Sequence, residues 1–204
     1  MINRPKVCTL PEGTGIMQTR HRKYLESRKF DAEQLEQVWG LKGTGILGSY
    51  KHRVIVPIIL NRELVSYQGR DITGQSELKY KACAIKDEVV HHKDIVYGID
   101  FIKNRRAIIV EGVADAWRLG KGAVCTFGTS YTTTQVNFIC DRLDEVFVLY
   151  DGLQDDANAI RKAKKLTNLL SMRGLKVELL ELDEGDPAEM KQEDADYLMK
   201  ELKI

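Results

Sequence analysis

Acidic residues directly follow two apolar runs in the second half of the sequence, and their type and spacing suit metal-dependent chemistry. Glu111 follows the run AIIV (107–110), and Asp151 follows the run VFVLY (146–150). Carboxylates that converge on one edge of a sheet suit Mg²⁺, a hard cation that takes oxygen ligands and often only one or two protein carboxylates. Such a site supports phosphoryl transfer by stabilising the attacking and leaving oxygens. The candidate metal ligands are Glu111, Asp151, Asp155, Asp156 and Asp186.

The same acidic residues have an ordinary structural alternative. Asp and Glu at strand ends and helix starts cap helices and interact favourably with the helix dipole. Asp155 or Asp156 is placed to cap a helix that begins near residue 157, and Asp115 is placed to lie on a helix surface. Residue type alone therefore leaves a metal site and a set of helix caps both open.

Short apolar runs alternate with helical patterns from residue 107 onward. These runs are 107–110, 123–127, 146–150 and 176–182. Short β-branched runs separated by longer helical stretches predict β-α-β units and a mostly parallel sheet. In such sheets the ligand site lies just beyond the carboxyl ends of the strands. This rule places Glu111 and Asp151 on the same edge of the predicted sheet.

The N-terminal half has a different pattern. Residues 21–41, HRKYLESRKFDAEQLEQVWGL, predict two short helices, the second capped by Asp31. Two strand-like runs follow at 53–60 and 64–70, and a polar turn joins them. Adjacent strands joined by a polar turn predict an antiparallel hairpin.

These patterns divide the chain into two predicted domains. Residues 1–105 form a small α+β subdomain that leans basic, and residues 106–204 form an α/β domain that ends in an amphipathic helix. The total charge identifies no partner, because 31 Lys and Arg oppose 30 Asp and Glu. A nucleic-acid partner has to be inferred from the local distribution of charge.

Cysteine spacing and hydropathy further narrow the class of protein that the sequence indicates. The cysteines are scattered, and no Cys or His pair has the spacing of zinc ligands, so we expect no zinc in this chain. The N-terminus lacks the apolar core of a signal peptide, and no run approaches the ~18 apolar residues that a membrane span requires. We therefore expect a cytoplasmic protein with no membrane partner.

Four motifs in order give the strongest signal. IIVEGVADAWRLG, AVCTFGTSYT, VFVLYDG and DEGDPAEM resemble the TOPRIM domain, most closely its bacterial DnaG-type and phage primase version. The resemblance implies a Rossmann-like fold with a mostly parallel sheet flanked by helices. It also implies that Glu111 is a metal-linked acid/base residue and that Asp151 is a Mg²⁺ ligand. The remaining residues that it assigns to the site are Asp115 and Asp186, with Gly112, Gly128 and Gly152 in the turns.

The sequence departs from the family pattern after Asp151 and Gly152. The family has a second Asp at the next position, where this chain has Leu153, and leucine cannot ligate a metal. Either Asp155 or Asp156 replaces the missing ligand, or the site uses fewer protein ligands and more water, or catalysis is weakened or lost.

The resemblance continues upstream through residues 52–100, where VPI, GR, KY and VYG occur in the order found before the TOPRIM domain of DnaG-type primases. It implies basic residues that contact nucleoside triphosphates and template phosphates. Carried over by position, these are Arg53, Arg70, Lys79 and Lys93. Such residues can hold a nucleic-acid backbone without reading bases. Each of these four basic residues, considered by itself, is also consistent with an ordinary solvated charge on the surface.

The resemblance therefore implies a DNA primase core that makes short RNA primers on single-stranded DNA, using Mg²⁺ or Mn²⁺ and ribonucleoside triphosphates, in a bacterial cell or a phage-infected host. A replicative helicase or a separate zinc-binding module is the expected protein partner. The alternative suggested by Leu153 is a weakened or inactive protein that binds single-stranded DNA or assists replisome assembly. A TOPRIM nuclease, which shares the acidic residues, is the less favoured alternative.

Overall fold

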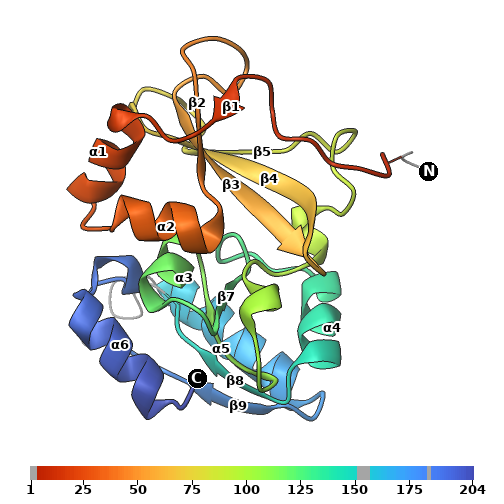
Figure 1. The fold of residues 1–204 in the computed structure, drawn as a ribbon. Helices are drawn as coiled ribbons and strands as arrows, with labels where there is room; N and C mark the ends of the chain where they lie inside the picture. Colours follow the sequence, from red (N-terminus) through yellow and green to blue (C-terminus); the bar gives the residue numbers. More distant parts are fainter. Residues whose placement is uncertain (1–3, 151–156, 183–184) are drawn as a thin grey trace. The chain divides into compact units, whose positions relative to one another are not determined.

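The computed structural model describes residues 4–150, 157–182 and 185–204. The chain forms two compact units, Met1–His91 and His92–Ile204 (Figure 1). This division lies earlier than the expected boundary between residues 105 and 106. The reason is that Tyr97 exchanges backbone hydrogen bonds of 3.0 and 3.2 Å with Cys125, which joins the segment after His92 to the second unit.

The first unit contains an antiparallel sheet of five strands in the order β1-β2-β3-β4-β5. The strands are β1 (Thr14–Gly15), β2 (Lys42–Thr44), β3 (Arg53–Leu60), β4 (Glu63–Asp71) and β5 (Tyr80–Ala82). The turn between β3 and β4 consists of Asn61 and Arg62, whose φ angles are 54° and 67°. Positive φ at both central residues matches the turn to the twist of the paired strands. The predicted antiparallel hairpin is confirmed.

Two helices precede the long strands, as the sequence predicts. They are α1 (Thr19–Ser27) and α2 (Ala32–Trp39). Asp31 caps α2 by accepting hydrogen bonds from the backbone N–H groups of Glu33 and Gln34, both at 2.9 Å. The helix ends at Gly40, which has a φ of 67° and therefore a left-handed conformation that glycine adopts without strain.

Close backbone contacts fix the arrangement of α1 and β2. The imidazole of His21, on α1, is fully buried, and its Nδ1 accepts a hydrogen bond of 3.0 Å from the backbone N–H of Gln18. A Cβ atom at Gly43, on β2, would lie 2.5 Å from this ring. Glycine is therefore required at position 43 for the histidine to pack against the strand.

Buried His21 predicts acid-sensitive stability of the first unit. Burial lowers the pKa of His21 from its usual 6.5, and the charge of Arg20 lowers it further. Because the unfolded chain then binds the proton more readily than the folded one, stability is fully present above pH 6.5 and falls as the pH drops below this value. We expect this group to lower the free energy of unfolding by at most about 1.4 kcal/mol per pH unit.

Urea denaturation near pH ~7.5 and pH ~5.5, on either side of the ordinary histidine pKa, measures the effect. The His21→Gln variant should lose much of the pH dependence, whereas His52→Asn should keep it. An unchanged dependence in His21→Gln would assign the acid sensitivity to other groups.

The second unit contains a parallel sheet of four strands in the order β7-β6-β8-β9. The strands are β6 (Arg106–Val110), β7 (Ala123–Cys125), β8 (Glu145–Val148) and β9 (Lys176–Leu179). The helices are α3 (Val113–Leu119), α4 (Thr133–Arg142), α5 (Ala157–Ser171) and α6 (Gln192–Glu201), with short 3₁₀ turns η1 (His92–Asp94), η2 (Ile99–Phe101) and η3 (Pro187–Glu189). The predicted parallel α/β fold and the final helix are confirmed.

The strand order determines which helices lie together. Parallel strands are connected by right-handed crossovers in nearly all proteins. From β6 the chain moves in one direction to β7, and it then moves in the opposite direction to β8 and on to β9. This reversal puts α3 on one face of the sheet and α4 and α5 on the other, and α3 packs with α6 while α4 packs with α5 (Figure 1).

The reversal also creates a switch point between β6 and β8. The connection that leaves β6 runs to β7, whereas the connection that leaves β8 runs away from it to β9. Ligands of open α/β sheets bind at such a point, outside the carboxyl ends of the strands.

Among the described residues, no helix has both the length and the apolar character needed to cross a membrane.

Candidate acidic site at the carboxyl ends of the parallel strands

Glu111 lies at the switch point, because it directly follows β6. The two strands at the switch point end together: the N–H of Leu149 donates to the carbonyl oxygen of Ile109 at 2.9 Å. Glu111 is partly exposed, as a ligand-binding carboxylate has to be. The other candidates near the end of β8 lie outside the described residues, and these are Asp151, Gly152, Leu153, Asp155 and Asp156.

Asp115 closes the turn that carries Glu111 into α3. Its Oδ2 accepts a hydrogen bond of 2.7 Å from the backbone N–H of Gly112, and its side chain is buried. A Cβ atom at Gly112 would lie 3.2 Å from that oxygen, so any larger residue would crowd the hydrogen bond. The expectation that Asp115 lies on a helix surface is therefore wrong: its carboxylate is buried and caps the turn, which shapes the backbone beside Glu111.

The loop after β7 holds the backbone of Glu111 from the other side. The N–H of Gly128 donates to the carbonyl oxygen of Glu111 at 2.8 Å, and the φ of Gly128 is 112°, a value that favours glycine. The hydroxyl of Thr126 donates to the carbonyl oxygen of Gly128 at 3.0 Å, and it also lies 3.0 Å from the hydroxyl oxygen of Tyr150. These contacts connect the ends of β6, β7 and β8.

Thr126 and Tyr150 were not singled out from the sequence. Both are buried, and burial raises the pKa of Tyr150, so its hydroxyl stays protonated and can keep its hydrogen bond. A polar residue at the end of an apolar strand is the sequence signal that identifies them, because a buried hydroxyl requires a partner.

Lys93 supports the same loop. Its ammonium group donates to the carbonyl oxygens of Thr126, Phe127 and Ser130 at 2.9, 2.9 and 2.7 Å. A lysine ammonium has three protons, so these contacts use its whole donor capacity. Burial lowers the pKa of Lys93, whereas the nearby Cys125 and Glu111 act in the opposite direction.

Lys162 of α5 contacts the same loop through side chains. Its ammonium group donates to the hydroxyl oxygens of Thr129 and Ser130 at 3.1 and 3.2 Å. Spacing along the chain does not single out this lysine, because it is one of several in a basic helix. The loop between β7 and α4 is therefore held by two cations from different segments of the second unit.

Asp186 lies on a different element. It caps η3, with its Oδ1 accepting a hydrogen bond of 3.0 Å from the backbone N–H of Glu189. The turn that it caps packs against α3, the helix that follows Glu111. The structure thus gives Asp186 a capping function and places its element beside the helix of the acidic site.

The predicted phosphate contacts in the first unit differ in exposure. Arg53 is buried, and its guanidinium donates to the carbonyl oxygens of Gly69 and Leu78 at 2.8 and 3.0 Å and to the hydroxyl of Ser76 at 2.6 Å. These contacts hold the segment after β4 against the sheet. Lys79, in the same segment, is exposed.

Arg70 lies between two aromatic rings. Its guanidinium carbon is 4.8 Å from the ring centre of Tyr80 and 5.7 Å from that of Tyr24, and its Nε donates to the hydroxyl of Tyr24 at 2.7 Å. Cation–π contacts of this kind restrain the orientation of a guanidinium. Arg70 is therefore a largely buried, positioned cation where β4 pairs with β5.

The chain resembles known proteins in both sequence and fold, although no protein-family model matches it. It is 33% identical over 156 residues to a DNA primase of Aquifex aeolicus (strain VF5), a match that covers 71% of this chain and 30% of that protein. It is 31% identical over 160 residues to a DNA primase of Borreliella burgdorferi, with 72% of this chain and 30% of that protein covered. A solved structure described as the DnaG primase catalytic domain bound to ssDNA has a TM-score of 0.74 and 19% identity, over 91% of this chain and 71% of that chain.

The α/β fold with its acidic switch point is therefore the fold of a DnaG-type primase catalytic domain. In sequence, the chain is a relative of bacterial DNA primases, and it spans about 30% of the length of those that it matches.

Proposed function

We propose that the chain is a primase core that synthesises short RNA primers on single-stranded DNA by nucleotidyl transfer. The observation that carries the proposal is Glu111, which lies at the switch point of the parallel sheet with its carbonyl oxygen held by Gly128 and its turn closed by Asp115. Both relatives in sequence are DNA primases, and the similar solved structure is described as bound to ssDNA, which supports single-stranded DNA as the template.

The side chains at this site suit a hard divalent cation, because carboxylate oxygens are the ligands that Mg²⁺ and Mn²⁺ prefer. When bound, the metal would neutralise charge on the reacting phosphates. Glu111 serves as the acid/base residue and as a metal ligand. Asp151, Asp155 and Asp186 are the further ligands that we propose, and Leu153 adds none.

The basic residues divide into two proposed roles. Arg70 and Lys79 contact template or nucleotide phosphates, since one is oriented by aromatic rings and the other is exposed. Arg53 and Lys93 each position the loop whose carbonyl oxygens they bind, because their donors are already used in these hydrogen bonds. We further propose a replicative helicase and a zinc-binding module as partners, in cytoplasmic bacterial or phage replication.

Incubation of the protein with single-stranded DNA, labelled ribonucleotides and Mg²⁺ or Mn²⁺ tests the proposal. Labelled RNA that is shorter than the template supports primer synthesis. Cleaved DNA would instead identify a nuclease. DNA binding without synthesis, even after addition of a helicase and a zinc-binding module, would favour the non-catalytic alternative.

A carboxylate at position 153 should strengthen metal binding. The family pattern has an Asp where this chain has Leu153, so the Leu153→Asp variant adds an oxygen ligand to the proposed site. We expect the Mg²⁺ concentration for half-maximal synthesis to fall by about tenfold, which corresponds to about 1.4 kcal/mol of added binding free energy. Leu153→Asn is the matched control, as it has a similar size without the charge. An Mg²⁺ dependence of Leu153→Asp equal to that of the unsubstituted protein would show that position 153 lies outside the metal site.

A further inference from the structure

Helix α5 has an outer face with an unusual combination of charge and apolar surface. Its inner face consists of Ala159, Ala163, Leu166 and Leu170, all nearly or fully buried. The helix contains Arg161, Lys162, Lys164 and Lys165 and has no Asp or Glu from Ala157 to Ser171. Lys162 is engaged with the loop after β7, which leaves the other cations for the outer face.

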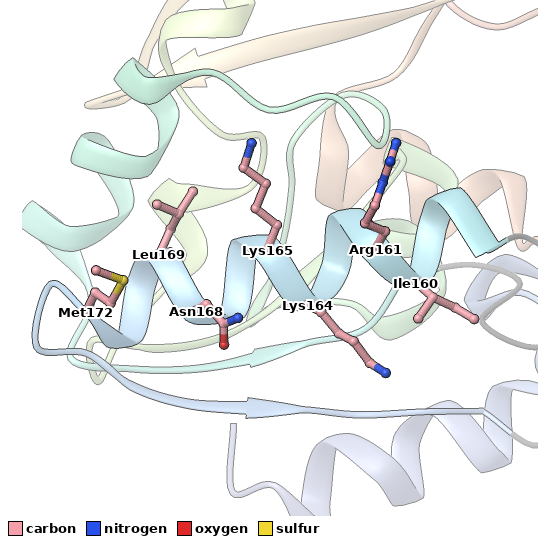
Figure 2. A pocket seen from close by; sticks show the side chains of 7 residues that line it. All are labelled: Ile160, Arg161, Lys164, Lys165, Asn168, Leu169 and Met172. Atoms are coloured by element: carbon pink, nitrogen blue, oxygen red, sulfur yellow. The ribbon is translucent and has the colours of Figure 1, made fainter.

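A groove runs along this outer face between two rows of side chains (Figure 2). One row is Ile160, Lys164 and Asn168, and the other is Arg161, Lys165 and Leu169, with Met172 at the end. Residues four positions apart stack on one side of a helix, so each row is a ridge of the kind that helices use to pack against each other. The groove between such ridges has the shape that accepts a ridge of another helix.

The charges on the groove are not compensated within the helix. Arg161 and Lys165 are like charges at i and i+4, an arrangement that destabilises a helix. In the described parts of the chain, no carboxylate forms an ion pair with Lys164 or Lys165. An acidic partner would relieve these repulsions.

The apolar part of the groove decides the class of partner. Ile160, Leu169 and Met172 line it, and 84% of the Met172 surface is exposed. Methionine is common at binding surfaces because it adapts to differently shaped partners. The groove has no aromatic residue on which a nucleic-acid base could stack. Apolar contact beside cations therefore favours a protein segment over single-stranded DNA.

We propose that the outer face of α5 binds an acidic amphipathic helix of a partner protein. In the complex, carboxylates at i and i+4 face Arg161, Lys164 and Lys165, and an apolar side chain packs on Leu169 and Met172. The residues that line the groove do not include Lys162, which contacts the loop after β7, and the proposal does not depend on primer synthesis.

Fluorescence anisotropy with labelled helical peptides of about 20 residues, long enough to fold in isolation, tests the proposal. One peptide carries Glu and Leu at i, i+4 spacing, and its partner has Gln in place of each Glu. We expect the acidic peptide to bind at least about tenfold more tightly than the Gln peptide, with an affinity that falls as salt rises. The double variant Lys164→Glu/Lys165→Glu should lose this binding.

The matched control is Lys191→Glu/Lys200→Glu, which makes the same change in net charge at exposed positions beside and within α6. It should bind the acidic peptide as the original protein does, and Met172→Ser should weaken binding without altering its salt dependence. Equal binding of the acidic and Gln peptides would overturn the proposal. The proposal would also be overturned if the acidic peptide did not bind while a labelled DNA oligonucleotide bound in a way that needs Lys164 and Lys165. Self-association that these substitutions abolish would overturn it as well.

Discussion

Replacement of Glu111 by Gln should reduce primer synthesis by about 10²–10³-fold while the protein remains folded. The substitution keeps the size of the side chain and removes the charge that would bind a metal and exchange a proton. Glu111 is partly exposed, and its turn is fixed by backbone contacts with Gly128 and by the cap of Asp115, so we expect the fold to survive the loss of its charge. Incorporation of labelled ribonucleotides on single-stranded DNA measures the loss.

The matched control is Glu201→Gln, an exposed position on α6 of the same unit. It should retain full activity, and thermal denaturation should give similar midpoints for both variants. Near-normal synthesis by Glu111→Gln would contradict the assignment of the active site to the switch point. Reduced single-stranded DNA binding by the same variant would show that Glu111 acts on the template rather than on the reacting groups.

Arg53→Ala should destabilise the first unit by about 2–4 kcal/mol, because it removes a buried charged donor and leaves several acceptors without their partner. Those acceptors are the carbonyl oxygens of Gly69 and Leu78 and the hydroxyl of Ser76. Urea denaturation measures the change. Lys86→Ala, an exposed position in the same unit, should leave the free energy of unfolding within about 0.5 kcal/mol of its original value.

A comparison of Arg53→Ala with Lys79→Ala separates a structural from a direct DNA contact at Arg53. If Arg53 positions the segment that carries Lys79, DNA binding under strongly stabilising conditions should fall less in Arg53→Ala than in Lys79→Ala. The salt dependence of binding should also decrease in Lys79→Ala, because each phosphate contact releases counterions. If Arg53→Ala left the stability unchanged and strongly reduced the DNA affinity, this result would instead support a direct contact between Arg53 and DNA.

Several features of this protein follow from local sequence alone. The hairpin of β3 and β4, the Asp31 cap and the alternation of strands and helices from residue 107 onward all agree with the structure. Each depends on residues close in the chain: turn residues that accept positive φ, a short polar side chain before a helix, and apolar runs of strand length. The position of Glu111 after a buried strand is local information of the same kind.

The functions of the polar side chains were decided by residues far away in the chain. Arg53 donates to groups 16 and 25 residues away, and Lys93 reaches carbonyls 33 to 37 residues away. A motif shows that a basic side chain is present, but it does not show whether the donors of that side chain are already hydrogen-bonded to a carbonyl oxygen of another segment. Buried donors must find acceptors when the chain folds, and only tertiary packing determines which ones.

The sequence by itself determined the α/β class, the antiparallel hairpin and the acidic residue at the end of β6, because local periodicity and turn chemistry specify these elements. Only the tertiary structure decided that Arg53 and Lys93 hold loops and that Thr126 and Tyr150 join the strand ends. These choices depend on which hydrogen-bonding groups become neighbours after folding, and spacing along the chain does not contain that information.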